Sequence, residues 1–387
     1  MDSKASKLMR IIIIHLIMVL INPVLSAQEQ KNPNKWSLVD ASKISDFPSI
    51  GLSGQSATIH NSRLFVLGGS NFPDAMPWEG GQKKYIDQLW IYQLEEKIQE
   101  IKQLISVKYP HPIAYATAIL HKDEWIVVGG ETPEGRTSEV KLIDLSKIND
   151  LSWKSLPSLP LPLSNAHAFI INEELHVAGG ETGSITSASH YVLNLRERSK
   201  GWQMLKALPY PVSHGVLLHD KKTNRILLLG GRSKVKDKPS VFYQSSLAFD
   251  VIRNEWKEAD KLPYPLAAGT GIVMPDETML IFGGDQGTVF NQVEECLIKA
   301  ASSTDPADIE SWNKIRKGLQ SSHPGFSRTV LKWDGNKSAW IESERLPFAT
   351  PVTTQAVCND QFVVIPGGEI KAGVRTSYFY YIKLKSK

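Results

Sequence analysis

The stretch Phe362-Val363-Val364-Ile365-Pro366-Gly367-Gly368 decides the fold, because it is the last of six apolar runs that end in a glycine pair. The runs are short, and β-branched and aromatic residues dominate several of them, which indicates strands. The six glycine pairs are Gly68-Gly69, Gly129-Gly130, Gly179-Gly180, Gly230-Gly231, Gly283-Gly284 and Gly367-Gly368. Successive pairs lie 61, 50, 51, 53 and 84 residues apart. The chain is therefore built from internal repeats.

A second marker follows the same repeat. A tryptophan precedes a proline by seven residues in four of the repeats: Trp153 and Pro160, Trp202 and Pro209, Trp256 and Pro263, Trp340 and Pro347. A tryptophan at a fixed point packs well between neighbouring sheets, and the proline stops the outer strand. A repeat near 50 residues is that of kelch-type blades. We predict an all-β fold, a six-bladed kelch-type β-propeller.

The two ends of the chain predict how the ring closes. The last glycine pair is followed by one strand-like run, residues 376–384, and by no further tryptophan strand. An orphan segment from Trp36 to Pro48 has no glycine pair before it. We expect this N-terminal segment to be the outermost strand of the last blade, because closure removes open sheet edges.

The long interval before the last pair predicts an insertion. Asp305-Pro306 has the form of a helix start, and the stretch from Gln292 to Ala301 is also helix-prone. We expect a helical insertion in blade five, at about residues 288–325. Such a long segment is either decoration or a wall of a pocket.

Composition excludes several classes of protein. The chain has 387 residues, of which 42% are hydrophobic and 22% charged, as in ordinary globular proteins. A net charge of +4, spread evenly, does not indicate a nucleic-acid binder. Two cysteines and no CxxC or HExxH spacing offer neither a disulfide scaffold nor a metal site.

The N-terminus has the form of a secretory signal. Lys4, Lys7 and Arg10 precede an apolar run, which ends in the small residues Ser26 and Ala27. We predict a signal peptide over residues 1–27, a propeller over 28–387, a periplasmic location and no stable membrane insertion after cleavage. An uncleaved anchor is the alternative. Export would place Cys296 and Cys358 in an oxidising compartment. There they either form a disulfide or stay buried as free thiols.

The residues directly after the glycine pairs are the first candidates for a site. In a kelch blade the loop after the pair opens near the central axis, so these residues are expected to converge. They are Ser70, Glu131, Glu181, Arg232, Asp285 and Glu369. Crowded carboxylates raise one another's pKa, which suits acid–base chemistry. The alternative is a solvated rim of mixed charge with salt bridges.

Two of these loops return with an arginine. Glu369 is followed by Gly373 and Arg375, and Glu131 is followed by Gly135 and Arg136. Such a hairpin holds a glutamate beside an arginine, whose planar fork suits a substrate carboxylate.

The long loop of blade one, residues 70–85, adds further candidates. Phe72 and Trp78 are candidates for stacking on a sugar. The alternative for Trp78 is that it anchors the loop against its blade. We assign catalysis to Glu369 and Arg375. We assign substrate binding to Glu131, Arg136, Glu181, Arg232, Asn71, Glu79 and Lys83.

The motif Gly368-Glu369 through Gly373-Val374-Arg375-Thr376, with Gly129-Gly130-Glu131-Thr132 and the stretch from Glu79 to Tyr85, resembles the bacterial N-acetylneuraminate epimerases. These are kelch-type sialic acid mutarotases, and this chain resembles a cyclically permuted branch. The resemblance implies interconversion of the α and β anomers of a small acidic sugar, with Glu369 as proton acceptor and Arg375 as its partner. It implies no metal or redox cofactor.

Two other functions are compatible with such a fold. A non-catalytic propeller that binds carbohydrate or a protein partner is the main alternative, since kelch folds host both. A sialidase is disfavoured, because the sequence has no repeated Ser-x-Asp-x-Gly-x-x-Trp boxes and no clear arginine triad.

Overall fold

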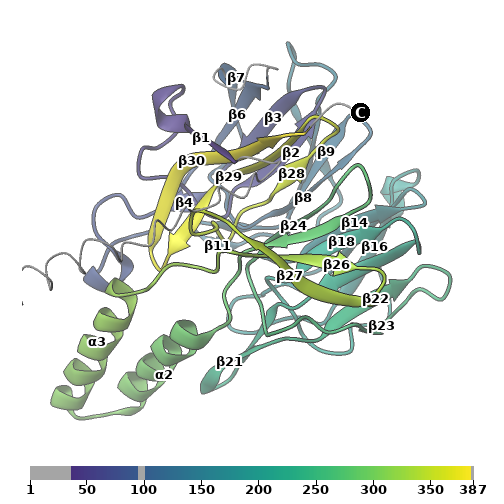
Figure 1. The fold of residues 1–387 in the computed structure, drawn as a ribbon. Coiled ribbons are helices and arrows are strands. Elements are labelled where there is room, and N and C mark those ends of the chain that lie inside the picture. The colour runs from purple at the N-terminus through teal and green to yellow at the C-terminus, as the bar shows by residue number, and fades with distance from the viewer. Residues whose placement is uncertain (1–35, 95–100, 385–387) are drawn as a thin grey trace, which may run out of the picture. The chain divides into compact units, whose positions relative to one another are not determined.

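Each glycine pair follows the second strand of a four-stranded antiparallel sheet or interrupts it. The computed structural model describes residues 36–94 and 101–384, and in these ranges there are six such sheets, the blades of a β-propeller (Figure 1). The predicted fold class is confirmed. The predicted signal peptide, residues 1–27, lies outside the described residues.

The first three blades follow one another along the chain. Blade one contains β2 (Ser56–His60), β3 (Arg63–Leu67), β6 (Gln88–Gln93) and β7 (Lys102–Lys108). Blade two contains β8 (Thr117–His121), β9 (Glu124–Val128), β12 (Val140–Asp144) and β13 (Trp153–Leu156). Blade three contains β14 (His167–Ile171), β15 (Glu174–Ala178), β16 (His190–Asn194) and β17 (Gln203–Met204).

The other three blades complete the ring. Blade four contains β18 (Val216–Asp220), β19 (Arg225–Leu229), β22 (Ser246–Asp250) and β23 (Glu255–Ala259). Blade five contains β24 (Thr270–Val273), β25 (Met279–Phe282), β26 (Thr329–Asp334) and β27 (Ala339–Arg345). Blade six contains β28 (Val357–Cys358), β29 (Phe362–Lys371), β30 (Val374–Lys383) and β1 (Ser37–Asp40).

Short elements lie between the long strands. Three hairpins follow glycine pairs: β4 (Ser70–Asn71) with β5 (Lys84–Tyr85), β10 (Glu131–Thr132) with β11 (Gly135–Arg136), and β20 (Arg232–Val235) with β21 (Lys238–Phe242). The 3-10 helices are η1 (Ala41–Lys43), η2 (Pro77–Glu79) and η3 (Arg198–Lys200).

The N-terminal strand closes the last blade, as predicted. β1 runs antiparallel to β30, with Ser37 opposite Tyr381 and Asp40 opposite Tyr378 (Figure 1). Trp36, just before β1, is buried against the edges of Phe282 and Phe348. The closing segment therefore packs on blade five as well as pairing within blade six.

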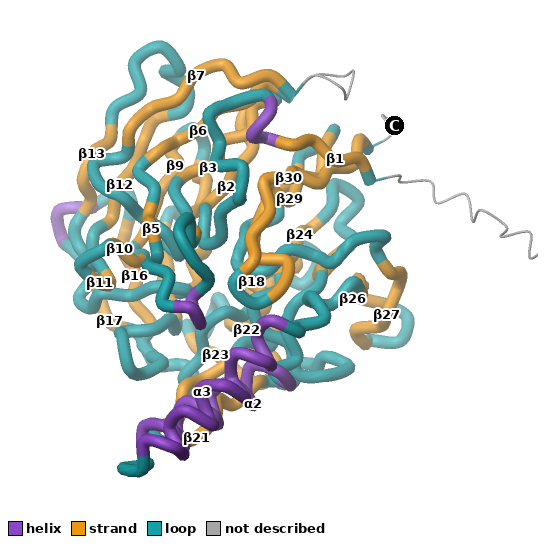
Figure 2. Tube along the Cα trace, turned by 90° about the vertical axis from the view of Figure 1, so that its left-hand side faces the viewer, coloured by secondary structure: helices purple, strands orange, loops and turns teal. Residues whose placement is uncertain are grey.

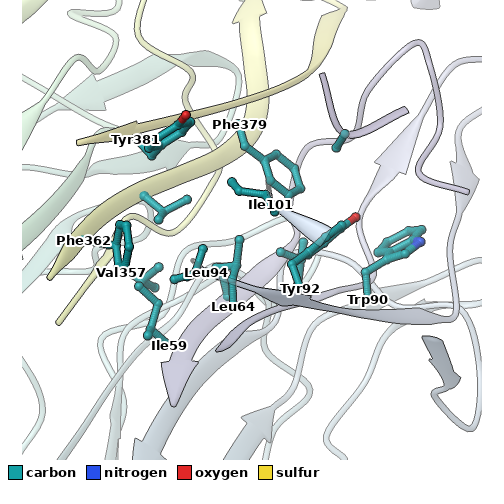
Figure 3. Packing of buried hydrophobic residues seen from close by; sticks show 14 of the residues in the cluster. Ile59, Leu64, Trp90, Tyr92, Leu94, Ile101, Val357, Phe362, Phe379 and Tyr381 are labelled. Atoms are coloured by element: carbon teal, nitrogen blue, oxygen red, sulfur yellow. The ribbon is translucent and has the colours of Figure 1, made fainter. Parts of the chain in front are cut away.

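The hydrophobic core is divided among the blade interfaces. Each cluster of buried side chains within the described ranges draws its members from two neighbouring blades. Figure 3 shows the cluster at the closure, where Leu64 and Trp90 of blade one pack with Phe362 and Phe379 of blade six. Because burying one such side chain contributes about 1.5–3 kcal/mol, each blade is stabilised mainly by its neighbours.

The glycine pairs allow this close contact between blades, and Gly129-Gly130 shows how. The amide of Gly130 donates to the carbonyl of Leu163 in the next blade, at 2.8 Å. Gly129 has φ +60°, and a Cβ on it would lie 2.2 Å from the same carbonyl oxygen. A side chain there would therefore push the next blade away.

A ring of backbone hydrogen bonds joins all six blades around the axis. In each blade, one residue that lies two to four positions before the innermost strand donates its amide to the carbonyl of the matching residue in the preceding blade, at 2.6–3.4 Å. These ring residues are Gly54, Tyr115, Asn165, His214, Ala268 and Thr353, all with φ between 50° and 75°. A cavity of about 230 Å³, lined by the ring residues and the innermost strands, lies along the axis.

The insertion in blade five is a helical hairpin, as predicted. α2 (Thr288–Ser302) and α3 (Pro306–Ser321) lie between β25 and β26 and project from the sheets beside β21 (Figures 1 and 2). Asp305 caps α3 by accepting a hydrogen bond from the Ala307 amide at 2.9 Å. Among the residues described, no helix is long and apolar enough to cross a membrane.

The two cysteines do not pair. Cys296 is buried in α2, and Cys358 in β28 donates its thiol to the carbonyl of Val273 at 3.2 Å. Of the two alternatives for these residues, the structure contains the free thiols.

Substitution of Gly129 tests the role of the glycine pairs. Gly129→Ala forces a side chain into the left-handed region and against the Leu163 carbonyl, so we expect unfolding stability to fall by at least about 2 kcal/mol. Urea denaturation followed by circular dichroism measures this loss. The control is Gly318→Ala in exposed α3, where nothing lies within 4 Å and stability should rise by roughly 0.5–1 kcal/mol. Equal effects at the two positions would contradict the interpretation.

Candidate active site

The residues after the glycine pairs gather around the ring. Each forms a backbone bridge to the residue that precedes a ring residue. The bridged pairs are Ser53 with Ser70, Ala114 with Glu131, Ser164 with Glu181, Ser213 with Arg232, Ala267 with Asp285, and Val352 with Glu369. In the chain, the bridged residues come directly before the ring residues, and the innermost strands that line the axial cavity come after them. The ring therefore lies between this face and the axial cavity.

Glu369 and Arg375 lie side by side at this face. They are directly opposite each other in the β29–β30 hairpin, and Arg375 Nη2 is 3.5 Å from Glu369 Oε2. The amide of Gly373 donates to Glu369 Oε1 at 2.8 Å. Arg375 Nε donates to Ser53 Oγ at 3.2 Å, which ties the blade-six hairpin to blade one. The arginine side chain is 5% exposed and the glutamate 18%, so these contacts hold both side chains in place and the glutamate is the more accessible of the two.

The long loop of blade one covers this pair. The ring of Phe72 lies 4.4 Å from the guanidinium carbon of Arg375, a cation–π contact. Trp78 lies against Gly373, where a Cβ would come within 2.7 Å of the indole and where φ is +73°. Trp78 therefore anchors its loop, but on the hairpin of blade six rather than on its own blade.

Blades two and three hold their carboxylates in ion pairs. Lys83 Nζ lies 2.8 Å from Glu131 Oε1, and Tyr85 also donates to this oxygen. Arg136 Nη2 lies 3.8 Å from Glu131 and 3.4 Å from Glu181. A single guanidinium group therefore spans the carboxylates of two neighbouring blades.

Glu181 is the most enclosed carboxylate of the face. Its side chain is 4% exposed, and Arg232 and Lys234 approach it at 3.2 and 2.9 Å. Ser213 Oγ donates to it at 3.1 Å. Burial alone would favour the neutral acid, but His214 when it is protonated, and the permanent charges of Arg232 and Lys234, lower the pKa of Glu181 to about 2.

The predicted rise in carboxylate pKa is wrong for two residues. At Glu131 burial is again outweighed, by Lys83 first and then by Tyr85 and Arg136, so its pKa is lowered. The sequence pattern could not reveal that cations from several loops meet these two glutamates. At Asp285 the pKa is raised, but the largest cause is burial rather than crowding with other carboxylates.

Two predicted binding residues have other contacts. Asn71 is buried and donates its amide to the carbonyl of Gly51 at 3.1 Å. Glu79 reaches α3, where Lys317 Nζ lies 3.2 Å from its carboxylate. The structure thus groups Glu131, Arg136, Glu181, Arg232 and Lys83 in one network and leaves Asn71 and Glu79 outside it.

Several residues of the face were missed by sequence reasoning. Tyr115 places its hydroxyl 3.1 Å from Ser70 Oγ and 3.4 Å from Ser53 Oγ, and Lys83 lies over its ring. His214 lies 3.6 Å from Glu181. A signal for both exists, because each ring residue stands 15–17 residues before the second glycine of its blade. His323, which follows α3, has no such marker.

The face combines side chains of both signs of charge. Arg232 packs against Phe290 of α2 at 4.5 Å, and its Nη1 is buried without a hydrogen-bond partner among the described residues. This donor, with those of Arg375, suits an anionic ligand. The carboxylates suit hydroxyl groups and proton transfer.

The depressed pKa of Glu181 predicts acid sensitivity. Its ionised form contributes stability that is fully present above its ordinary pKa of 4.5 and is lost as pH falls toward about 2. Relative to Glu181→Gln, the wild-type protein should therefore lose about 2 kcal/mol of unfolding free energy between pH 7 and pH 3. Urea midpoints at the two pH values measure this. Exposed Glu258→Gln is the control, and a wild-type advantage over Glu181→Gln that does not change with pH would refute the assignment.

Comparison with known proteins agrees with the geometry. Residues 156–387 match the family model described as N-acetylneuraminate epimerase. The chain is 25% identical over 232 residues to the N-acetylneuraminate epimerase of Salmonella typhimurium, covering 58% of each chain. It is 24% identical over 227 residues to that of Vibrio vulnificus, covering 57% of each. The chain thus matches just under three fifths of the length of these curated relatives.

A solved structure shows the same fold over a longer range. The structure titled "Structure of YjhT" superposes with a TM-score of 0.58 at 14% identity, covering 88% of this chain and 96% of that chain. The predicted cyclic permutation stays a prediction. Because the family model covers more than half of the sequence, the chain belongs to the N-acetylneuraminate epimerase family.

Proposed function

We propose that the protein is an isomerase that interconverts the α and β anomers of N-acetylneuraminate. The observation that carries the proposal is the contact between Glu369 and Arg375, at 3.5 Å, on the face where the blade hairpins meet. The names of the relatives support the substrate and the reaction.

The pair suits both the charge and the chemistry of this sugar. Arg375 donates to Ser53 Oγ and to the Gly373 carbonyl and faces Glu369. Since a guanidinium group has five N–H donors, two remain for a substrate carboxylate. The Glu369 carboxylate accepts the proton of the anomeric hydroxyl, which opens the ring to the keto form. Reclosure on the other face of the carbonyl gives the other anomer.

We also propose that the protein acts in the periplasm. Support comes from the basic start, apolar run and small residues of the segment 1–27. An acidic sugar released outside the cell would reach the enzyme there.

Glu369→Gln tests the proton acceptor. The amide keeps the size of the side chain and can still accept from the Gly373 amide, but it cannot take a proton. We expect the catalysed rate to fall by roughly 10²-fold or more. Proton NMR of freshly released α-N-acetylneuraminate follows the approach to the β anomer. The control is Glu134→Gln, an exposed glutamate in the related hairpin of blade two, which should retain full activity.

The same experiment separates an enzyme from a binding module. If the wild-type protein binds the sugar in calorimetry but leaves the relaxation at its buffer rate, the isomerase proposal fails and a carbohydrate-binding propeller replaces it.

Arg375→Lys tests recognition of the substrate carboxylate. Lysine keeps the charge but loses the planar fork that contacts Ser53, Gly373 and Phe72 together. We expect KM for the sugar to rise at least about tenfold, which corresponds to about 1.4 kcal/mol of binding free energy. Initial rates by NMR at several sugar concentrations measure it. An unchanged KM would show that another cation, such as Arg232, holds the carboxylate.

A further inference from the structure

The segment after α3 brings a second acid–base group toward Glu369. The amide of Ser327 donates to the carbonyl of Gly284 at 3.2 Å, and the amide of Phe326 donates to the carbonyl of Ile370 at 3.1 Å. These two hydrogen bonds hold the segment from His323 to Ser327 between two loops. One loop carries Asp285, and the other carries Glu369.

Asp285 and Glu369 occupy the same position in neighbouring blades. Both bridge to the residue before a ring residue, and the two ring residues are hydrogen-bonded, with the Thr353 amide donating to the Ala268 carbonyl at 3.1 Å. Glu131 and Glu181 stand in the same relation, and one nitrogen of Arg136 lies within 3.8 Å of both. A single guanidinium nitrogen thus spans the carboxylates of Glu131 and Glu181, and the backbones of Asp285 and Glu369 stand in the equivalent positions of the next pair of blades.

The environment of Asp285 differs from that of Glu369. Asp285 accepts the amide of Gly287 on one oxygen, at 2.9 Å. Burial raises its pKa despite the opposing effects of this hydrogen bond and of the charges of His323 and Arg232. Glu369 instead faces the guanidinium of Arg375. One carboxylate is thus biased toward holding a proton, while the other lies beside a fixed positive charge.

His323 lies near enough to both carboxylates for their charges to act on its imidazole, and it has a defined tautomer. The amide of Gly325 donates to its Nδ1 at 3.0 Å, so Nδ1 carries the lone pair and Nε2 carries the hydrogen. The charged groups that act on this imidazole are Asp285, Glu369 and Lys371. After burial as the largest cause, these leave its pKa lowered, so the imidazole becomes charged only at pH values below its ordinary pKa range, and its charge then opposes protonation of Asp285.

We infer that Asp285 is the proton donor of the proposed reaction, acting on the ring oxygen while Glu369 acts on the anomeric hydroxyl, and that His323 is a positioning residue near both. The inference rests on the proposed function. Glu369 takes the hydroxyl proton, and the O–H electron pair forms the carbonyl. The bond from the anomeric carbon to the ring oxygen breaks, and this oxygen takes the proton of Asp285. In reclosure on the other carbonyl face both protons return, so both carboxyl groups are restored.

Asp285→Asn is the direct test, because asparagine keeps the shape and the hydrogen bond from Gly287 but cannot supply the proton. In the NMR assay we expect kcat to fall at least tenfold, with KM for N-acetylneuraminate changed less than threefold. The wild-type rate above buffer should fall as pH rises through the pKa of Asp285, and this limb should vanish in the variant. The control is Asp144→Asn, which alters the same kind of turn contact, to the Ser146 amide, at a half-exposed position in blade two.

His323→Phe provides an independent test that does not require Asp285→Asn to fold. Phenylalanine retains an aromatic ring beside Phe326; the ring centroids of His323 and Phe326 lie 4.9 Å apart. The substitution removes the imidazole, whose charge lowers the pKa of Asp285. The alkaline limb should therefore move to higher pH. A limb that stays in place, or a fully active Asp285→Asn protein, overturns the inference while leaving the isomerase proposal standing. An inactive wild-type protein overturns the isomerase proposal itself, and the role of Asp285 with it.

Discussion

The ring of six backbone hydrogen bonds is the constraint on which the rest of the structure depends. Five of its residues are not glycine, yet all adopt the left-handed region, which costs of order 1–3 kcal/mol each. The cost is offset because each residue joins two blades, and the apolar clusters between the blades hold the same register. The ring also fixes the positions of the six residues that follow the glycine pairs, since each is bridged to the neighbour of a ring residue.

The carboxylates that follow the glycine pairs occupy equivalent positions in their blades. Their environments differ because different loops bring different side chains to them. Glu131 and Glu181 meet lysines and arginines from adjacent loops and remain ionised. Asp285 lies near the base of the helical insertion, where burial is the largest influence. Glu369 keeps one guanidinium neighbour and lies next to the blade-one loop. A sixfold scaffold with unequal loops thus gives carboxylates with unequal environments at equivalent positions.

The insertion and the blade-one loop bound the site from two sides. Phe72 and Trp78 pack on the hairpin that carries Glu369 and Arg375, while Phe290 of α2 packs on Arg232. Lys317 of α3 pairs with Glu79 of the blade-one loop, so the two segments meet. The insertion thus contacts the face that carries the site, and Glu79 joins the insertion to the blade-one loop instead of lying in the charged network.

The sequence by itself determined the blade count, the closing strand, the insertion and the pairing of Glu369 with Arg375. Each depends on short-range patterns: a glycine pair after an apolar run, or a glutamate and an arginine placed across one hairpin. The tertiary structure alone decided which carboxylates are paired with cations, that Trp78 anchors on blade six, and that His323 comes near both Asp285 and Glu369. These features depend on side chains from different blades meeting in space. A pKa is set by the charges and burial around a group, and neither is encoded in the residues beside it along the chain.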